Sequence, residues 1–334
     1  MNKVHSDSNL NHNNSDNIHD SGILENRYIL KESLGIGGFG TVYKIFDTLL
    51  KVMLALKLPL NDKKDESNFK SEVKILKKIK DSNINTCIRY YDSGTGSLTI
   101  NGKTIKRKYI IMELANDENL LDKLLKTSNG FSEDICKYIL SKIIKCTKDL
   151  HKIGICHRDI KPENIVLIGD EYEIKICDLG LADFFINDNN EKILLNKCVG
   201  TQPYKAPELI MNKYYDAEKV DVFSIGVAIF VLMTKKFPFQ KATNILELKR
   251  NLYNYIMTNQ IDSYWKKMET DENIKLKVLS PEFKELFINM VKYEPENRIS
   301  LDEIINSDWM KDIKYASEEY LESLRIKMIR EMTI

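Results

Sequence analysis

Three short motifs in a fixed order constrain this chain more than any other feature. They are His157-Arg158-Asp159-Ile160-Lys161-Pro162-Glu163-Asn164, then Asp178-Leu179-Gly180, then Ala206-Pro207-Glu208. The first motif brings together a carboxylate, an ammonium group and an amide. These are the groups needed to orient a hydroxyl, neutralise a phosphate and hold a metal ion. The motifs therefore indicate phosphoryl transfer.

The length and the apolar pattern predict two lobes. The chain has 334 residues, 43% of them hydrophobic, which is enough for sizeable cores. From Tyr28 to Met112, β-branched and aromatic residues alternate around a glycine-rich turn, and one helical stretch follows Phe69, Val73, Leu76 and Ile79. Beyond Met112 the apolar spacing is mostly helical. The expected fold class is α+β, with a small β-rich lobe carrying one main helix and a larger, mainly α lobe.

Charge and cysteine usage limit the partners and the compartment. Fifty Lys and Arg against 49 Asp and Glu leave a net charge of +1, so no global field argues for nucleic acid or a membrane surface. The longest apolar run, Val222 to Met233, is too short to span a bilayer and predicts a buried helix. Six cysteines form no CxxC pair and follow no hydrophobic leader, so we expect reduced thiols in the cytoplasm, with the nucleus as an alternative.

The two ends of the chain differ in character. Residues 1–22 consist largely of Asn, Ser, Asp and His, and we expect them to be disordered because they have little to bury. At the other end, apolar residues recur at every fourth position and predict a helix with one apolar stripe: Ala316, Tyr320, Leu324, Met328 and Met332. We expect this stripe to dock on its own domain. A regulatory partner of the calmodulin type is the alternative, because basic residues flank the stripe.

The glycine-rich turn runs from Gly35 to Val42 in the form GxGxxGxV. Such a turn alone requires only a hairpin with positive φ. Strands on both sides favour a loop that folds over phosphates, whereas a dinucleotide-binding fold would need a strand, a turn and a helix. Lys57 follows on a later strand, and Glu72 on the helix of the same lobe offers a carboxylate partner for it.

Together with Asp221 and Arg298, these motifs resemble the eukaryotic protein kinase family, serine/threonine type, over residues 28–310. The resemblance implies an N-lobe at 23–112, a hinge at 113–119, a C-lobe at 120–310 and a helical tail at 311–334. ATP with Mg²⁺ is expected between the lobes, and proteins with Ser or Thr hydroxyls as substrates.

The family resemblance also implies roles for individual residues. Asp159 would accept the proton of the substrate hydroxyl, Lys161 would neutralise the γ-phosphoryl group, and Lys57, aimed by Glu72, would hold the α and β phosphates. Asn164 and Asp178 would bind Mg²⁺. With Met112 as gatekeeper, the implied nucleotide-binding residues are Leu34, Gly35, Gly37, Gly38, Phe39, Gly40, Val42, Ala55, Lys57, Met112, Glu113, Ala115, Asn119, Glu163, Val166 and Asp178.

Further matches concern the scaffold and the substrate. Glu208 and Arg298 would form a buried ion pair, and Asp221 would anchor a helix. Glu163 stands where relatives that favour basic peptides carry an acid, but Asn119 stands where such relatives carry a second one, which speaks against a simple arginine-directed rule. Cys177 precedes Asp178 and is expected to face the nucleotide pocket. An inert thiol is favoured there, and reaction with a thiol-directed inhibitor is the alternative.

The segment from Asp178 to Gly200 contains no Ser, Thr or Tyr. Lys197 stands where many relatives carry a phosphothreonine, yet the arginine that usually binds this phosphate, Arg158, is present and needs an anion. The candidates are Asp183, Asp188 and Glu191. We therefore expect an activation segment that is ordered without phosphorylation.

The motif style is closest to the calcium/calmodulin-dependent branch and its protist relatives, although Phe223 stands where Trp is usual and Leu179 where Phe is commonest. A pseudokinase scaffold is the alternative function. Its usual signature is the loss of Lys57, Asp159 or Asp178, and all three are in place. A small-molecule kinase is a third alternative, disfavoured because Thr201 to Glu208 resembles a peptide-docking loop.

Overall fold

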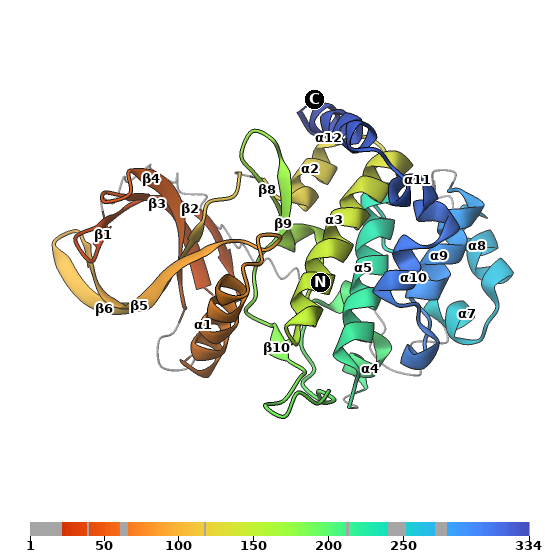
Figure 1. Ribbon diagram of the computed structural model, residues 1–334, viewed down its shortest axis with the longest axis horizontal. Coiled ribbons are helices and arrows are strands. Elements are labelled where there is room, and N and C mark those ends of the chain that lie inside the picture. Colours follow the sequence, from red (N-terminus) through yellow and green to blue (C-terminus); the bar gives the residue numbers. More distant parts are fainter. Residues whose placement is uncertain are drawn as a thin grey trace, which may run out of the picture.

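The computed structural model describes residues 22–38, 40–60, 66–116, 118–211, 214–239, 252–270 and 279–333. These residues form a β-rich N-lobe and a helical C-lobe, joined by a short connection (Figure 1). The predicted α+β fold with two lobes is therefore confirmed. The predicted disorder of residues 1–22, apart from Gly22, and the role given to Phe39 lie outside the described residues.

Antiparallel strands close the N-lobe into a barrel in the order β1-β2-β3-β4-β6-β5. Their bounds are Ile23–Leu24 (β1), Tyr28–Gly37 (β2), Gly40–Asp47 (β3), Val52–Leu58 (β4), Tyr90–Ile100 (β5) and Lys103–Glu113 (β6). Strands β5 and β6 form a hairpin that turns at Asn101 and Gly102, with φ of 50° and 73°. Two positive φ angles are what a two-residue hairpin turn requires.

Helix α1 (Glu66–Asp81) packs on this barrel through one face. Its buried residues are Glu72, Ile75, Leu76 and Ile79, which follow the three- and four-residue spacing of a helical face. The helix therefore presents a carboxylate inward among apolar neighbours, towards β4.

The C-lobe is built around α3 (Glu133–Lys152) and α5 (Ala217–Thr234). The predicted buried helix at Val222 to Met233 is confirmed, since α5 is buried along nearly its whole length. The smaller helices are α2 (Leu120–Lys126), α4 (Pro207–Ile210), α7 (Tyr253–Met257), α8 (Ile261–Thr270), α9 (Pro281–Met290), α10 (Leu301–Ile305) and α11 (Lys311–Lys314). Two short antiparallel strand pairs complete the lobe: β8 (Ile165–Ile168) with β9 (Glu173–Ile176), and β7 (Ile155–Cys156) with β10 (Asp183–Phe184).

The C-terminal helix α12 (Glu318–Thr333) lies against α3 and α2 at the top of Figure 1. Leu324, Met328 and Met332 are buried, so the prediction that this helix docks on its own domain is confirmed. The stripe is shorter than predicted, because Tyr320 is exposed. Ion pairs to Asp134 from Lys327 (2.8 Å) and to Glu171 from Arg325 hold its flanks. A regulatory partner for this tail stays a prediction.

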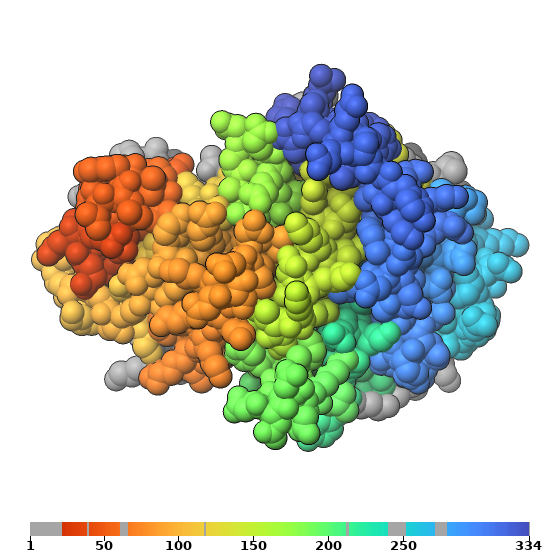
Figure 2. All heavy atoms as spheres, viewed as in Figure 1, coloured from red at the N-terminus to blue at the C-terminus, as the bar shows by residue number. Residues whose placement is uncertain are grey.

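No helix within the described ranges is both long enough and apolar enough to cross a membrane. Figure 2 shows the two lobes in close contact, with the segment around residues 180–200, in green, at the lower edge of the molecule. This segment joins the catalytic motifs to α4.

Candidate active site

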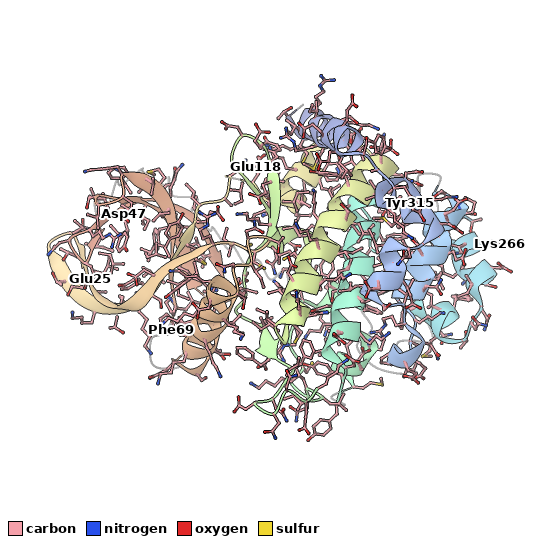
Figure 3. The ribbon with its side chains drawn as sticks, in the orientation of Figure 1. Glu25, Asp47, Phe69, Glu118, Lys266 and Tyr315 are labelled. Carbon is pink, nitrogen blue, oxygen red and sulfur yellow. The ribbon has the colours of Figure 1, made fainter. Side chains whose placement is uncertain are left out.

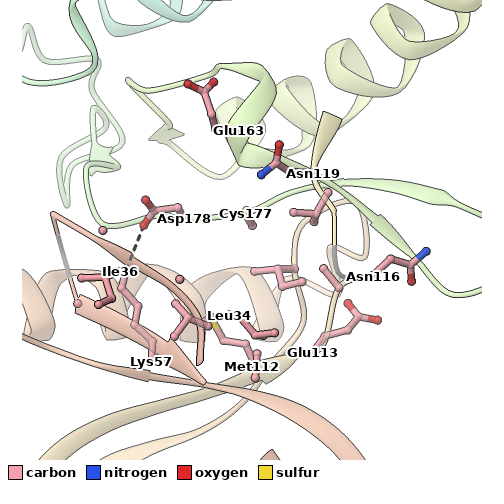
Figure 4. A pocket seen from close by; sticks show the side chains of 18 of the residues that line it. Leu34, Ile36, Lys57, Met112, Glu113, Asn116, Asn119, Glu163, Cys177 and Asp178 are labelled. Atoms are coloured by element: carbon pink, nitrogen blue, oxygen red, sulfur yellow. Dashed lines mark hydrogen bonds and ion pairs between the residues drawn. The ribbon is translucent and has the colours of Figure 1, made fainter. Parts of the chain in front are cut away.

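A cavity of about 350 Å³ opens between the lobes beneath the glycine-rich hairpin (Figure 4). It brings together most of the predicted nucleotide-binding residues: Leu34, Gly35, Gly37, Gly40, Val42, Ala55, Lys57, Met112, Glu113, Ala115, Asn119, Glu163, Val166 and Asp178. Glu72 and Cys177 also line it, as do Ile36, Ile88 and Asn116, which the sequence did not single out. Its size is in the usual range for small-molecule sites.

Gly38 was predicted to bind nucleotide but does not line the cavity. It lies at the exposed tip of the turn between β2 and β3, directly after Gly37, which pairs with Gly40. Its place at the tip of the hairpin, outside the paired strands that roof the cavity, explains the difference.

The other glycines of the hairpin serve two different purposes. Gly40 has φ of 145°, and a Cβ there would lie 2.4 Å from the carbonyl oxygen of Leu58, so the fold itself demands glycine. At Gly35 and Gly37 a Cβ would meet no atom within 4 Å. Glycine at these two positions leaves the backbone open to a ligand, which fits a loop that approaches phosphates closely.

Lys57 on β4 joins the two lobes electrostatically. Its Nζ donates to Glu72 Oε1 at 2.6 Å and to Asp178 Oδ1 at 3.0 Å, the latter drawn in Figure 4. Burial lowers the pKa of Lys57, but the two carboxylates outweigh it and raise the pKa above its usual value. Burial raises the pKa of Asp178, and the attraction of Lys57 more than offsets it. Lys57 is thus a fixed cation facing the cavity, and the predicted pairing with Glu72 is confirmed.

Of the predicted catalytic residues, Lys161 contacts Asp159, which is 4% exposed, whereas Lys57 and Glu72 pair with each other. Its Oδ1 accepts the backbone N–H of Thr201 at 2.7 Å, and its Oδ2 lies 2.9 Å from Lys161 Nζ. Lys161 also donates to Thr201 Oγ1 at 2.6 Å. The carboxylate is therefore held from two sides, as a positioned proton acceptor requires.

Asn164 and Asp178 provide oxygen donors suited to Mg²⁺. The Asn164 Nδ2 group donates to the Asp159 carbonyl at 2.8 Å, which leaves the amide oxygen as its acceptor. Asp178 meets Lys57 through Oδ1, and its pKa is lowered as described above. Asp178 lines the cavity, and Asn164 lies next to its wall, since the Asn164 backbone carbonyl accepts from Cys177 N at 2.9 Å. A carboxylate and an amide oxygen are the donor types that suit a hard divalent cation.

The catalytic loop has a strained backbone that Asp221 supports. Arg158 and Asp178 have φ of 64° and 55°, in the left-handed region that residues other than glycine seldom occupy. The Asp221 carboxylate, fully buried, accepts the backbone N–H of His157 at 3.0 Å and of Arg158 at 2.7 Å. It also pairs with His151 Nε2 at 2.8 Å. The anchoring role expected for Asp221 is thus confirmed.

Arg158 has a partner for each of its donor nitrogens. Nε donates to the Leu181 carbonyl at 2.8 Å, Nη1 to the Tyr215 hydroxyl at 3.0 Å and Nη2 to Asp183 Oδ2 at 3.0 Å. Among the three predicted anions, Asp183 is therefore the one bound. Asp188 is exposed, and Glu191 accepts instead from Asn187 at 3.0 Å.

Two side chains at the hinge are engaged elsewhere. The Asn119 amide oxygen caps α2, accepting from Leu121 N at 2.9 Å and Asp122 N at 3.1 Å. This leaves the Nδ2 donor for its predicted contact with the nucleotide. The Glu113 carboxylate accepts from Lys175 Nζ at 3.0 Å. Lys175 is 2% exposed and was missed, because a lysine between apolar strand residues looks like the solvent-facing position of an alternating strand.

The C-lobe contains the predicted buried ion pair. Arg298 Nη1 donates to Glu208 Oε1 at 2.8 Å and Nη2 to Oε2 at 3.2 Å. Arg298 is 1% exposed and also donates to the carbonyls of Lys219 and Lys292. The pair ties α4 to the region ahead of α10.

Cys177 is predicted to resist alkylation although it lines the cavity. Burial raises the pKa of its thiol to about 12, so little thiolate is present at neutral pH. In native protein treated with iodoacetamide at pH 7, mass spectrometry is expected to find Cys177 unmodified while the exposed Cys198 is alkylated. Modification of Cys177 at the rate of Cys198 would show that the thiol is activated.

Comparison with known proteins agrees with this geometry. Residues 28–310 match the model of the protein kinase domain family. The chain belongs to the protein kinase family. It is 28% identical to the human SNF-related serine/threonine-protein kinase over 87% of this chain and 34% of that protein. It is 28% identical to the probable serine/threonine-protein kinase fhkC of Dictyostelium discoideum over 91% of this chain and 47% of that protein. It is also 28% identical to the serine/threonine-protein kinase chk-2 of Caenorhabditis elegans over 92% of this chain and 62% of that protein.

The chain thus spans less than two thirds of the length of these curated relatives. The family and the serine/threonine type predicted from the sequence are confirmed. The closer resemblance to the calcium/calmodulin-dependent branch stays a prediction.

Proposed function

We propose that this kinase transfers the γ-phosphoryl group of ATP to Ser or Thr hydroxyls of proteins. The observation that carries the proposal is that Lys57 and Asp178 line one interlobe cavity while the pair of Asp159 and Lys161 is joined to its wall. The link is Asn164, whose side chain donates to the Asp159 carbonyl and whose own carbonyl accepts from the N–H of Cys177 in that wall. In the reaction, the substrate oxygen forms a bond to the γ-phosphorus, the bond to the β–γ bridging oxygen breaks, and ADP leaves. Asp159 takes the proton of the hydroxyl.

The residues of the cavity divide this work. Lys57, aimed by Glu72, would pair with the α and β phosphates, and Lys161 would neutralise the moving γ-phosphoryl group. Asn164 and Asp178 would hold Mg²⁺, which neutralises phosphate charge when bound. Adenine would lie between Ala55 and Val166, with backbone groups of Glu113 and Ala115 as partners. The Nδ2 of Asn119 and the carboxylate of Glu163 would face the ribose.

We further propose that the enzyme needs no phosphorylation of its activation segment. The three donor nitrogens of Arg158 that would bind a phosphate already meet Leu181, Tyr215 and Asp183. The backbone adds support, because β10 pairs with β7 and the chain at Leu195 pairs with Tyr215. An internal carboxylate therefore takes the place that a phosphate would otherwise fill.

Protein made in bacteria and treated with phosphatase is expected to keep its full activity. Replacing Asp183 with Asn is expected to lower kcat about tenfold, because the charge-assisted hydrogen bond to Arg158 is replaced by a neutral one. Asp188→Asn is the matched control, since Asp188 lies exposed in the same segment. Loss of activity after dephosphorylation, or equal activity of the two variants, would refute the proposal that the enzyme needs no phosphorylation of this segment.

Transfer of labelled phosphate from ATP to casein or myelin basic protein tests the proposed function itself. Incorporation that requires Mg²⁺ and yields phosphoserine or phosphothreonine supports it. Binding of ATP without any incorporation would instead favour the pseudokinase scaffold. A location in the cytoplasm or nucleus also stays a proposal, for which six free cysteines are the supporting observation.

A further inference from the structure

Two lysines belong to the segment that contacts the catalytic Asp159. Lys197 lies a few residues before Thr201, whose N–H binds Asp159, and Lys205 follows the turn Gln202–Tyr204. Both are fixed by their backbones: the Lys197 carbonyl accepts from the Tyr215 hydroxyl at 3.0 Å, and Lys205 N donates to the Gln202 carbonyl at 3.2 Å. The Lys205 side chain lies near Asp159, because a Cβ added at Gly200 would be 3.7 Å from both Lys205 Cγ and Asp159 Oδ1. Lys197 is exposed on the same segment.

Neither lysine forms an ion pair with a carboxylate in the part of the chain that the structure describes. The contact of Lys205 Nζ is Cys198 Sγ, at 4.0 Å. Lys192 of the same segment behaves differently, because it pairs with Asp216 at 2.9 Å and Glu218 at 2.5 Å. Unneutralised charge of one sign beside a cleft attracts ligands of the opposite sign.

On the hinge side of the cleft, the carboxylate of Glu118 is not free to favour basic substrates, while Asp117 lies outside the described residues. Glu118, labelled in Figure 3, pairs with Lys123 at 2.9 Å and with Lys126. The neighbouring Asn119 carries no charge, and its amide oxygen caps α2. Glu118 and Asn119 thus contribute no free negative charge on this side, whereas the two lysines on the other side have no carboxylate partner among the described residues.

Glu163 is the carboxylate that opposes this picture. It lines the nucleotide cavity, and its Oε2 is buried without a hydrogen-bond partner among the described residues. If the charge of Glu163 dominated substrate binding, the enzyme would prefer basic peptides. This is the opposite of the preference expected from Lys197 and Lys205.

We propose that the enzyme selects Ser or Thr acceptors that have acidic side chains beside them, with Lys197 and Lys205 binding those side chains. The inference rests on the proposed kinase activity and names the substrate class for the same site. Because it depends on charge at a solvated rim, the preference is expected to weaken as ionic strength rises.

Matched peptides measure this preference. Each carries one acceptor Ser with three Glu, three Ala or three Arg residues placed before or after it. The expected kcat/KM for an acidic peptide exceeds that of the alanine peptide by about fivefold for each ion pair gained. In the Lys197→Glu, Lys205→Glu double variant the acidic-to-basic ratio is expected to reverse, an outcome that misfolding cannot produce.

Lys266→Glu provides the charge-matched control. Lys266 is exposed on α8, at the end of the C-lobe far from the cleft (Figure 3). Its peptide preference is expected to equal that of the unmodified enzyme. Equal or higher kcat/KM for the arginine peptides in the unmodified enzyme would overturn this inference alone. Failure to label any peptide, casein or myelin basic protein would overturn the kinase function and this inference with it.

Discussion

Asp159→Asn is expected to lower kcat by about a hundredfold to ten-thousandfold, the range lost when a general base is removed. The asparagine oxygen can still accept from the Thr201 N–H, which Asp159 Oδ1 now accepts at 2.7 Å. Its amide nitrogen would face Lys161 and Asn164, which are donors, and could take no proton from a substrate hydroxyl. The loss should therefore fall on the chemical step.

Initial rates of labelled phosphate transfer, with thermal unfolding and ATP binding on the same samples, check this expectation. Binding and Tm should stay close to those of the unmodified enzyme. Asp262→Asn, an exposed substitution of the same type at the start of α8, serves as control. A variant that keeps more than a tenth of kcat would exclude Asp159 as the proton acceptor.

Glu208→Gln is expected to destabilise the protein more than the other single substitutions proposed for it, lowering the free energy of unfolding by about 3–5 kcal/mol. The substitution leaves the Arg298 guanidinium, which is 1% exposed, without its counter-charge. A typical domain is stable by only about 5–15 kcal/mol, so the variant would unfold at a markedly lower temperature.

Urea unfolding measures the difference, with Glu118→Gln as the matched control. Glu118 forms its ion pairs near the surface, where such pairs contribute at most about 1 kcal/mol. A second variant, Glu208→Leu with Arg298→Met, removes both charges and should lose less than Glu208→Gln, although the carbonyls of Lys219 and Lys292 lose a donor. Equal losses for Glu208→Gln and Glu118→Gln would show that the buried pair is not essential.

The sequence predicted those parts of the site whose spacing is local. Asp159, Lys161 and Asn164 belong to one loop, so their order along the chain nearly determines their arrangement. The pairing of Lys57 with Glu72 was also predictable, because β4 and α1 are neighbours in a small lobe with little room for a second arrangement.

Contacts that depend on tertiary register could not be predicted in this way. Asp183, Asp188 and Glu191 are three carboxylates close together in the sequence, and nothing local distinguishes them. The pairing of β10 with β7 decides between them, because it places Asp183 opposite Cys156, two residues before Arg158. Lys175 is a similar case, since its burial depends on Glu113 from a distant strand.

The central claim is that side chains far apart in sequence converge on one magnesium nucleotide between the lobes. A crystal structure with Mg²⁺ and a non-hydrolysable ATP analogue tests it most directly. We expect adenine between Ala55 and Val166, the phosphates beside Lys57, and the metal on Asn164 and Asp178. A nucleotide bound elsewhere, or a cleft that stays empty at saturating analogue, would contradict the account.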